Sequence, residues 1–343
     1  MDMKLSITAI VLSFATLGIA QPNIFDIKSF GGASNADITM AFTNAWKAAC
    51  GSTTASKVII PRGIYKIHAV DVKGPCKAPI EVQVDGTIQA SQNPDELNDA
   101  SYQWVKFGYV DYFTLSGKGV FDGNGETAWT QNDCGKNSTC KRRSMNFGFN
   151  FLKLSIVQDI ISKDSKNFHV NVLGCTNFTF DGLTITAPAT SKNTDGIHIG
   201  RSTDDVKVLN TNISTGDDCI SLGQGSRQIT VQNVNCGPGH GISVGSLGKN
   251  PKEEATEHVL VKNCTISNTD NGVRIKTWPS SPGTSPITDM HFEDTIMVNV
   301  LNPVIIDQEY CPWNQCSKQV PSKIKISKVI FKNIRGTTTA AAV

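Results

Sequence analysis

Apolar and polar residues alternate in a series of short segments that recur through the middle of the chain. The first segments span residues 177–185, 205–213, 228–234 and 258–266, and later versions start near residues 287 and 324. This alternation is typical of a strand that buries one face. A second set of short apolar segments lies between them, at residues 196–199, 219–222, 241–244, 272–275 and 303–306. The sequence therefore predicts two families of strands that repeat along the chain.

Equivalent positions in the first family recur at intervals of more than twenty residues. Phe178, Val206, Ile229 and Val259 are separated by 28, 23 and 30 residues. A repeat of this length, built of short strands and Gly, Asn or Asp turns, is typical of a solenoid. The helical period of 3.6 residues is not visible, and the Leu and Asn ladder of a leucine-rich horseshoe is missing. We therefore predict an all-β fold, a single-stranded right-handed parallel β-helix that forms one domain over residues 21–343.

The first third of the chain is less regular. Residues 38–49 are predicted to form a helix, and Cys50 follows it. Because solenoids need capped ends, we expect this short N-terminal helix to cover the open end of the first coil. Residues 123–150 are rich in polar and basic side chains, and we interpret them as a long loop.

The N-terminus has the layout of a secretory signal peptide. Lys4 precedes an apolar run of 16 residues from Leu5 to Ala20, with small residues at its end. The alternative is a membrane anchor, but a spanning helix needs about 20 apolar residues. We therefore predict that residues 1–20 are a signal peptide cleaved after Ala20, and that the mature protein is secreted to the extracellular space or cell wall without a membrane partner.

Ten cysteines agree with an oxidising compartment, in which disulfides persist. The complete pairing does not follow from the sequence, but three pairs are plausible local disulfides: Cys134 with Cys140, Cys219 with Cys236, and Cys311 with Cys316. A zinc site is the alternative, and the spacings do not match ligand motifs such as C-x2-C. Four Asn-x-Ser/Thr sequences are candidate glycosylation sites: Asn137, Asn177, Asn212 and Asn263.

The formal net charge of +2 argues against a broad nucleic-acid-binding surface. It leaves room for a local basic site that binds an acidic ligand. We expect no nucleic-acid partner and a monomeric protein.

Three polar residues recur at nearly one interval in the same strand family. Asp195, Asp218 and His240 are separated by 23 and 22 residues, and each precedes a short apolar strand. Because neighbouring strands lie about 4.8 Å apart, three successive coils would bring these residues within roughly 10 Å. Each aspartate alone is better explained as an ordinary turn residue, but the repeated register favours one functional patch.

Carboxylic acids gathered in one cleft suit glycosidic hydrolysis. One acid must be protonated to assist the leaving oxygen, and another must be ionised to activate water or to attack directly. Asp217 beside Asp218, with Asp195 one coil away, lets like charges raise the proton affinity of one carboxyl. Arg274 and Lys276 lie one coil or so further on, two residues apart on one strand face, where they could grip a substrate carboxylate.

These residues resemble the four motifs of the polygalacturonases, glycoside hydrolase family 28. The motifs occur here in the family's order as Asn193-Thr194-Asp195, Gly216-Asp217-Asp218, Gly239-His240-Gly241 and Arg274-Ile275-Lys276. The resemblance, which covers about residues 25–335, implies a right-handed parallel β-helix and hydrolysis of polygalacturonic acid with inversion. It implies no metal and no organic cofactor.

The resemblance also implies a role for each site residue. Asp217 would be the general acid, Asp195 and Asp218 would activate water, and His240 would support the protonation state of the acid. Binding of the galacturonate is implied for four further residues: Asn193, Arg274, Lys276 and Tyr310.

Residues 306–316 are similar to plant pollen exopolygalacturonases. This implies release of single galacturonic acid units from the non-reducing end of demethylated pectin, and the 123–150 segment is a candidate wall for the cleft. Endo action, a non-catalytic β-helix that binds the cell wall, and a calcium-dependent pectate lyase are the alternatives. Family members usually continue beyond the point where this sequence ends, so we expect a shortened C-terminal end and an uncapped last coil.

Overall fold

The computed structural model describes residues 21–97, 101–134, 136–137, 139–312 and 316–340. The proposed signal peptide, residues 1–20, lies outside them. Among the described residues, no helix is long and apolar enough to pass through a lipid bilayer.

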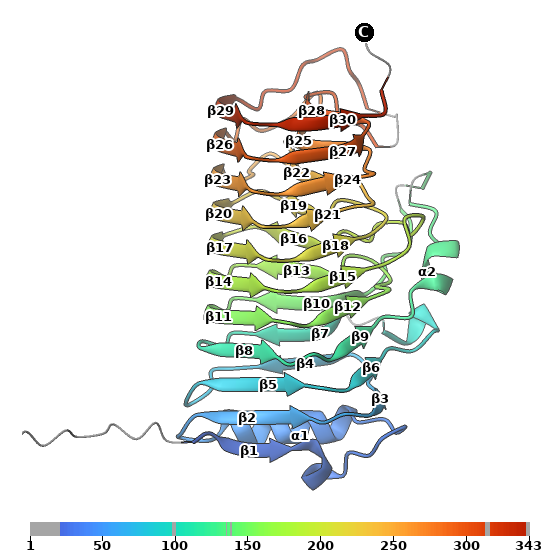
Figure 1. The fold of residues 1–343 in the computed structure, drawn as a ribbon, viewed down its shortest axis with the longest axis vertical. Helices are drawn as coiled ribbons and strands as arrows, with labels where there is room; N and C mark the ends of the chain where they lie inside the picture. The colour runs from blue at the N-terminus through green and yellow to red at the C-terminus, as the bar shows by residue number, and fades with distance from the viewer. Residues whose placement is uncertain (1–20, 98–100, 135, 138, 313–315, 341–343) are drawn as a thin grey trace, which may run out of the picture.

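The chain winds through three parallel sheets, and each turn of the winding adds one strand to each sheet (Figure 1). The first sheet contains β1 (Asn23–Asp26), β2 (Ser56–Ile60), β5 (Ile80–Val84), β8 (Phe113–Ser116), β11 (Lys153–Gln158), β14 (Thr176–Asp181), β17 (Thr203–Leu209), β20 (Ser226–Gln232), β23 (Thr256–Lys262), β26 (Ile287–Glu293) and β29 (Ile326–Lys332). The second sheet contains β3 (Ile64–Lys66), β6 (Thr87–Gln89), β9 (Val120–Asp122), β12 (Ile161–Lys163), β15 (Thr184–Thr186), β18 (Asn212–Ser214), β21 (Asn235–Cys236), β24 (Thr265–Ser267), β27 (Ile296–Val300) and β30 (Arg335–Thr338). The third sheet contains β4 (Val70–Lys73), β7 (Gln103–Gly108), β10 (Met145–Asn150), β13 (Val170–Leu173), β16 (Ile197–Gly200), β19 (Ile220–Leu222), β22 (Ile242–Leu247), β25 (Asn271–Thr277) and β28 (Asn302–Asp307). The predicted parallel β-helix is confirmed.

Like residues stack from coil to coil along the interior. Phe178 pairs with Val206, Val206 with Ile229, and Ile229 with Val259, which are the equivalent positions expected from the sequence. All four side chains are fully buried. Because successive side chains of a strand point to opposite faces, the alternation of apolar and polar residues places the apolar side chains on the inner face of each sheet.

The N-terminal end of the coil stack is covered by α1 (Thr39–Cys50), which lies beside β1 and β2 in Figure 1. Its buried face includes Trp46, whose ring centroid lies 5.6 Å from that of Phe107 and 5.9 Å from that of Phe113. The predicted capping helix is therefore confirmed, shifted by one residue. At the other end of the coil stack, Val304, Ile306 and Phe331 of β28 and β29 are exposed.

The prediction that residues 123–150 form one long loop is wrong in part. The segment contains the short helix α2 (Glu126–Thr130), and its last six residues form β10 of the third sheet. β10 carries polar residues that are buried rather than solvated: Asn150 Nδ2 donates to Gln103 Oε1 at 2.8 Å, and Asn146 Nδ2 donates to Ser162 Oγ at 3.0 Å. These hydrogen bonds compensate for the cost of burying the two amide side chains, which in the sequence alone are typical of a loop.

The turns from the first sheet to the second sheet carry a ladder of side-chain amides. Asn210, Asn233 and Asn263 have left-handed backbone angles, with φ of 50°, 58° and 52°. Asn210 Nδ2 donates to Asp181 Oδ1 at 2.7 Å, Asn233 Nδ2 to Asn210 Oδ1 at 2.9 Å, and Asn263 Nδ2 to Asn233 Oδ1 at 2.8 Å. Asparagine tolerates this backbone conformation better than most residues, so the same side chain shapes the turn and joins it to the next coil.

The three local disulfides expected from the sequence are present, between Cys134 and Cys140, Cys219 and Cys236, and Cys311 and Cys316. A fourth disulfide, which the sequence did not identify, links Cys50 at the end of α1 to Cys76. Cys175 and Cys264 are unpaired and buried.

Candidate active site

The acidic residues and the histidine lie at the turns that lead from the second sheet into the third sheet. Ile197 of β16 pairs with Ile220 of β19, which pairs with Ile242 of β22. The residues two positions before these isoleucines are Asp195, Asp218 and His240. They therefore occupy equivalent places on three successive coils, as the 23- and 22-residue spacing predicts.

Asp218 is buried between two cations. Lys276 Nζ lies 2.5 Å from Asp218 Oδ2, Arg274 Nη2 lies 3.2 Å from Oδ1, and Ser243 Oγ donates to Oδ1 at 2.8 Å. Burial alone would raise the pKa of Asp218, but the charges of Lys276 and Arg274 outweigh it and lower the pKa below its usual value. Asp218 is the ionised carboxylate of the site.

Asp195 has the opposite environment. Its side chain is also buried, and Ser221 Oγ donates to Oδ2 at 2.9 Å. Burial and the negative charges of Asp217 and Asp218 raise the pKa of Asp195 well above its usual value. Burial, together with these two like charges, thus raises the proton affinity of the Asp195 carboxyl.

Asp217 is more accessible than its two neighbours and is joined to His240. Its Oδ1 atom lies 2.9 Å from His240 Nδ1 and accepts a hydrogen bond from the Asp218 backbone amide at 2.8 Å. The hydrogen bond to Asp217 raises the pKa of His240. Gly239 and Gly241 flank the histidine with φ of 142° and 83°, and a Cβ on Gly241 would lie 2.0 Å from a backbone oxygen of Asn271. The two glycines therefore allow the tight turn that holds the imidazole over Asp217.

Arg274, Lys276 and Tyr310 form the basic side of the patch. The Tyr310 ring centroid lies 5.8 Å from Arg274 Cζ and 5.2 Å from Lys276 Nζ, within cation–π range. Trp278 meets the Tyr310 ring edge-on at 5.8 Å between centroids. Lys276 is nearly buried and Arg274 is partly exposed, so Arg274 has the more accessible charge.

Several residues of the site were not identified from the sequence. His198 Nδ1 lies 2.8 Å from Ser221 Oγ, the hydroxyl that contacts Asp195. Asp270 Oδ2 lies 3.5 Å from His240 Nε2, on the side of the ring away from Asp217. These contacts extend the patch beyond the acids themselves.

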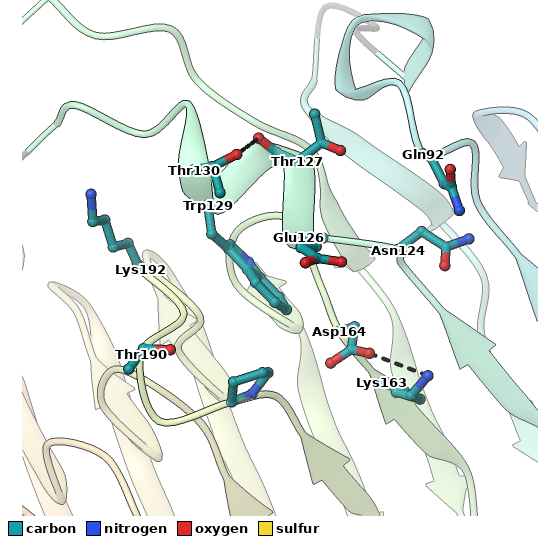
Figure 2. Close-up of a pocket in the computed structure, with 12 residues that line it drawn as sticks. Gln92, Asn124, Glu126, Thr127, Trp129, Thr130, Lys163, Asp164, Thr190 and Lys192 are labelled. Carbon is teal, nitrogen blue, oxygen red and sulfur yellow. Dashed lines mark hydrogen bonds and ion pairs between the residues drawn. The ribbon is translucent and has the colours of Figure 1, made fainter.

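Asn193 connects the site to a neighbouring loop. Asn132 Nδ2 donates to Asn193 Oδ1 at 2.9 Å, and Lys192 Nζ donates to the Asn132 carbonyl at 2.9 Å. Lys192 also lines a pocket of about 850 Å³, which lies between α2 and the loop that carries Thr190 and Lys192 (Figure 2). The pocket therefore adjoins the segment that carries Asp195.

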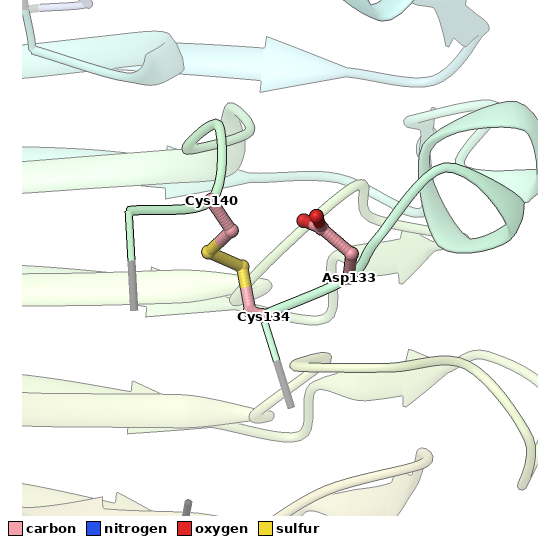
Figure 3. A group of neighbouring side chains, drawn as sticks. All are labelled: Asp133, Cys134 and Cys140. Carbon is pink, nitrogen blue, oxygen red and sulfur yellow. A yellow bond between two sulfur atoms is a disulfide. The ribbon is translucent and has the colours of Figure 1, made fainter. Parts of the chain in front are cut away.

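Among the described residues, two groups of side chains bring potential metal ligands close together. Asp217, Asp218 and His240 each offer a ligand atom within 4.8 Å of the others. The Asp218 carboxylate, however, already lies against two cations, and His240 Nδ1 is bound to Asp217, so these residues do not fit a divalent ion well. Asp133 lies beside Cys134 and Cys140 (Figure 3), but these cysteines form a disulfide and offer no thiolate to zinc.

The model of glycosyl hydrolases family 28 matches residues 50–343. This chain belongs to glycosyl hydrolases family 28. A polygalacturonase of Medicago sativa is 61% identical over 351 residues, covering 99% of this chain and 82% of the relative, and an exopolygalacturonase of Platanus acerifolia is 51% identical over 92% of this chain and 83% of the relative. The chain is therefore a member of a glycosyl hydrolase family, and relatives that match it over nearly its whole length are named polygalacturonases and exopolygalacturonases.

Solved structures agree with this family 28 assignment. The endo-xylogalacturonan hydrolase of Aspergillus tubingensis superposes with a TM-score of 0.77 at 26% identity, covering 90% of this chain and 83% of the other. The polygalacturonase of Erwinia carotovora ssp. carotovora superposes with a TM-score of 0.75 at 20% identity, over 96% of both chains, and supports the fold.

Proposed function

We propose that residues 21–343 form a secreted, monomeric, inverting hydrolase that cleaves α-1,4-galacturonosyl linkages of demethylated pectin from the non-reducing end. The observation that carries the proposal is the unequal environment of three neighbouring carboxyls beside Arg274 and Lys276. The pKa of Asp218 is lowered, the pKa of Asp195 is raised, and Asp217 is accessible and hydrogen-bonded to His240. Hydrolysis of a glycosidic bond needs carboxyls in both protonation states.

Asp217 is assigned as the general acid. It is the most accessible of the three carboxyls, and its Oδ1 atom lies against the His240 imidazole. The hydrogen bond with Asp217 raises the pKa of His240, so the pair keeps a proton to higher pH than a free imidazole would. As the bond breaks, the Asp217 carboxyl donates its own proton to the glycosidic oxygen, and the His240 imidazolium passes a proton to the resulting Asp217 carboxylate.

Asp218 and Asp195 are assigned to the attacking water. The Asp218 carboxylate, whose pKa is lowered, accepts the proton of the attacking water. The neighbouring Asp195 carboxyl, whose pKa is raised, orients this water by hydrogen bonding. Lys276 and Arg274 compensate for the negative charge of Asp218 before reaction, and they remain close enough to bind the carboxylate of the sugar. Tyr310 and Asn193 flank this position and complete the binding site.

Exo action is supported by the resemblance of residues 306–316 to pollen enzymes and by the exopolygalacturonase relative. The contact between Asn132 and Asn193 places the loop after α2 against the catalytic segment, where it could block the cleft. Secretion is supported by four disulfides and by the proposed signal peptide.

The product profile on polygalacturonic acid labelled at its reducing end tests the proposal. Unlabelled monomer as the sole early product supports exo action from the non-reducing end, whereas a ladder of oligomers indicates endo action. Asp217→Asn should lower the rate of product release by about 10²–10⁴-fold, and Asp111→Asn, at an exposed aspartate, is the matched control. Turnover by Asp217→Asn at the rate of the control would refute the acid assignment.

A further inference from the structure

The pocket beside the catalytic segment is built by turns of several coils on the N-terminal side of the acids. The lining side chains that bear on its chemistry are those of Gln92, Asn124, Glu126, Trp129, Lys163 and Lys192. Its volume of about 850 Å³ is within the range of small-molecule sites. Figure 2 shows Trp129 from α2 extending into the space between Glu126 and the loop that carries Thr190 and Lys192.

Trp129 is held rigidly at this position. Its indole Nε1 donates to the Ser165 carbonyl at 2.9 Å. Its ring packs closely on Gly125, where a Cβ would lie 2.6 Å from Trp129 Cζ2. The ring remains half-buried, so part of its surface is available to a ligand in the pocket. A fixed aromatic ring with an open surface offers a large apolar contact at little entropic cost.

The charged side chains of the pocket balance one another. Lys163 Nζ lies 3.2 Å from Asp164 Oδ2 and 2.9 Å from Asp122 Oδ2, so acids already neutralise this cation. Lys192 Nζ donates to the Asn132 carbonyl, and Glu126 is exposed on the other side of Trp129. The pocket lining therefore contains two bases and two acids. A uronate entering the pocket would lie near Glu126 and would lack a pair of cations like Arg274 and Lys276.

We propose that this pocket binds a neutral pyranose that branches from the galacturonate backbone, stacked on Trp129. The proposal rests on the function proposed above, because the backbone must occupy the catalytic patch. Thr127, Thr130, Gln92 and Asn124 supply uncharged hydrogen-bonding groups around the ring. Since the pocket adjoins the loop that carries Asn193, a branch on a backbone unit near the acids reaches it.

Binding to hexagalacturonates tests this proposal without turnover. Each probe carries one xylose on a different unit, and the unbranched hexamer is the reference. The protein carries Asp217→Asn, and affinities are measured by titration calorimetry. One branch position should bind about three- to tenfold tighter than the reference, since tenfold corresponds to about 1.4 kcal/mol. Adding Trp129→Ala should remove the gain, and Trp129→Phe should restore most of it, with thermal melts confirming that each variant folds.

Three results would overturn the proposal. Equal affinity for every branched and unbranched hexamer would mean that no branch enters the pocket. An equal loss for all hexamers in Trp129→Ala, or tighter binding of the unbranched hexamer by Glu126→Gln, would mean that the backbone itself occupies it. Failure of the proposed function is a separate result, namely absence of hydrolysis of unbranched polygalacturonate by the wild-type protein.

Discussion

Replacing Lys276 by methionine tests the charge arrangement at the centre of the site. Lys276 Nζ lies 2.5 Å from Asp218 Oδ2, and the two side chains are only 7% and 2% exposed. Removing one partner of a buried ion pair costs about 3–5 kcal/mol, because the remaining charge stays buried without compensation. Arg274 and Ser243 still contact Asp218 in the variant. We therefore expect the low end of the range, a loss of about 3 kcal/mol in the free energy of unfolding.

Urea unfolding at neutral pH, followed by fluorescence, measures this loss. The matched control is Lys262→Met, because Lys262 Nζ lies 3.8 Å from Glu293 Oε2 with its side chain 43% exposed. An exposed pair of this kind contributes about 0–1 kcal/mol. Adding Asp218→Asn to Lys276→Met should recover much of the stability, since the buried negative charge is then gone. A loss in Lys276→Met no larger than in Lys262→Met would refute the reasoning.

The same variant has a pH signature with a defined sign. The pKa of Asp218 is lowered in the folded chain, so its ion pair stabilises the protein above the unfolded pKa of about 3.9. This stabilisation is lost as the pH falls through the lowered pKa of the folded state. The difference in stability between wild type and Lys276→Met should therefore be largest near neutral pH and should shrink in acid. A difference that stays constant down to strongly acidic pH would contradict it.

Four further outcomes are expected. Asp217→Asn should lower kcat by about 10²–10⁴-fold while the melting temperature stays near that of the wild type, because general acid catalysis contributes that much. Arg274→Ala should raise KM for polygalacturonate, and an unchanged KM would exclude Arg274 from substrate binding. His240→Asn should move the alkaline limb of the kcat/KM profile to lower pH, since the pKa of His240 is raised and the proton shared with Asp217 would be lost earlier. Replacing Cys219 and Cys236 by serine should lower the free energy of unfolding by about 3 kcal/mol, the value expected for a loop of this length, as checked by denaturant titration.

The sequence could predict that the site residues lie on successive coils, because their spacing equals the length of one coil. Asp195, Asp218 and His240 lie 23 and 22 residues apart, and no long insertion interrupts these coils. Asp270 lies 30 residues beyond His240, because residues 248–255 lengthen the intervening coil. Because of this insertion, Asp270 does not follow the regular spacing and was not identified from the sequence, although the Asp270 carboxylate lies close to His240.

The electrostatic roles could be predicted less well than the positions. The sequence placed Arg274 and Lys276 on one face beside the acids, which suited a substrate carboxylate. It could not show that both cations contact Asp218, because that depends on side-chain lengths and directions across coils. For the same reason the sequence left open which carboxyl would keep its proton. β10 was missed because its buried amides resemble solvated loop residues until their partners are known.

The amide ladder at the turns has a consequence for modification of the chain. Asn263 belongs to an Asn-x-Thr acceptor sequence, and its Nδ2 atom donates to Asn233 Oδ1 at 2.8 Å. An N-linked glycan would be attached through that same nitrogen. Asn177 is exposed and stands outside this series of contacts. A glycan on Asn263 would therefore occupy the same amide nitrogen that hydrogen-bonds the neighbouring coil, which the acceptor sequence alone does not reveal.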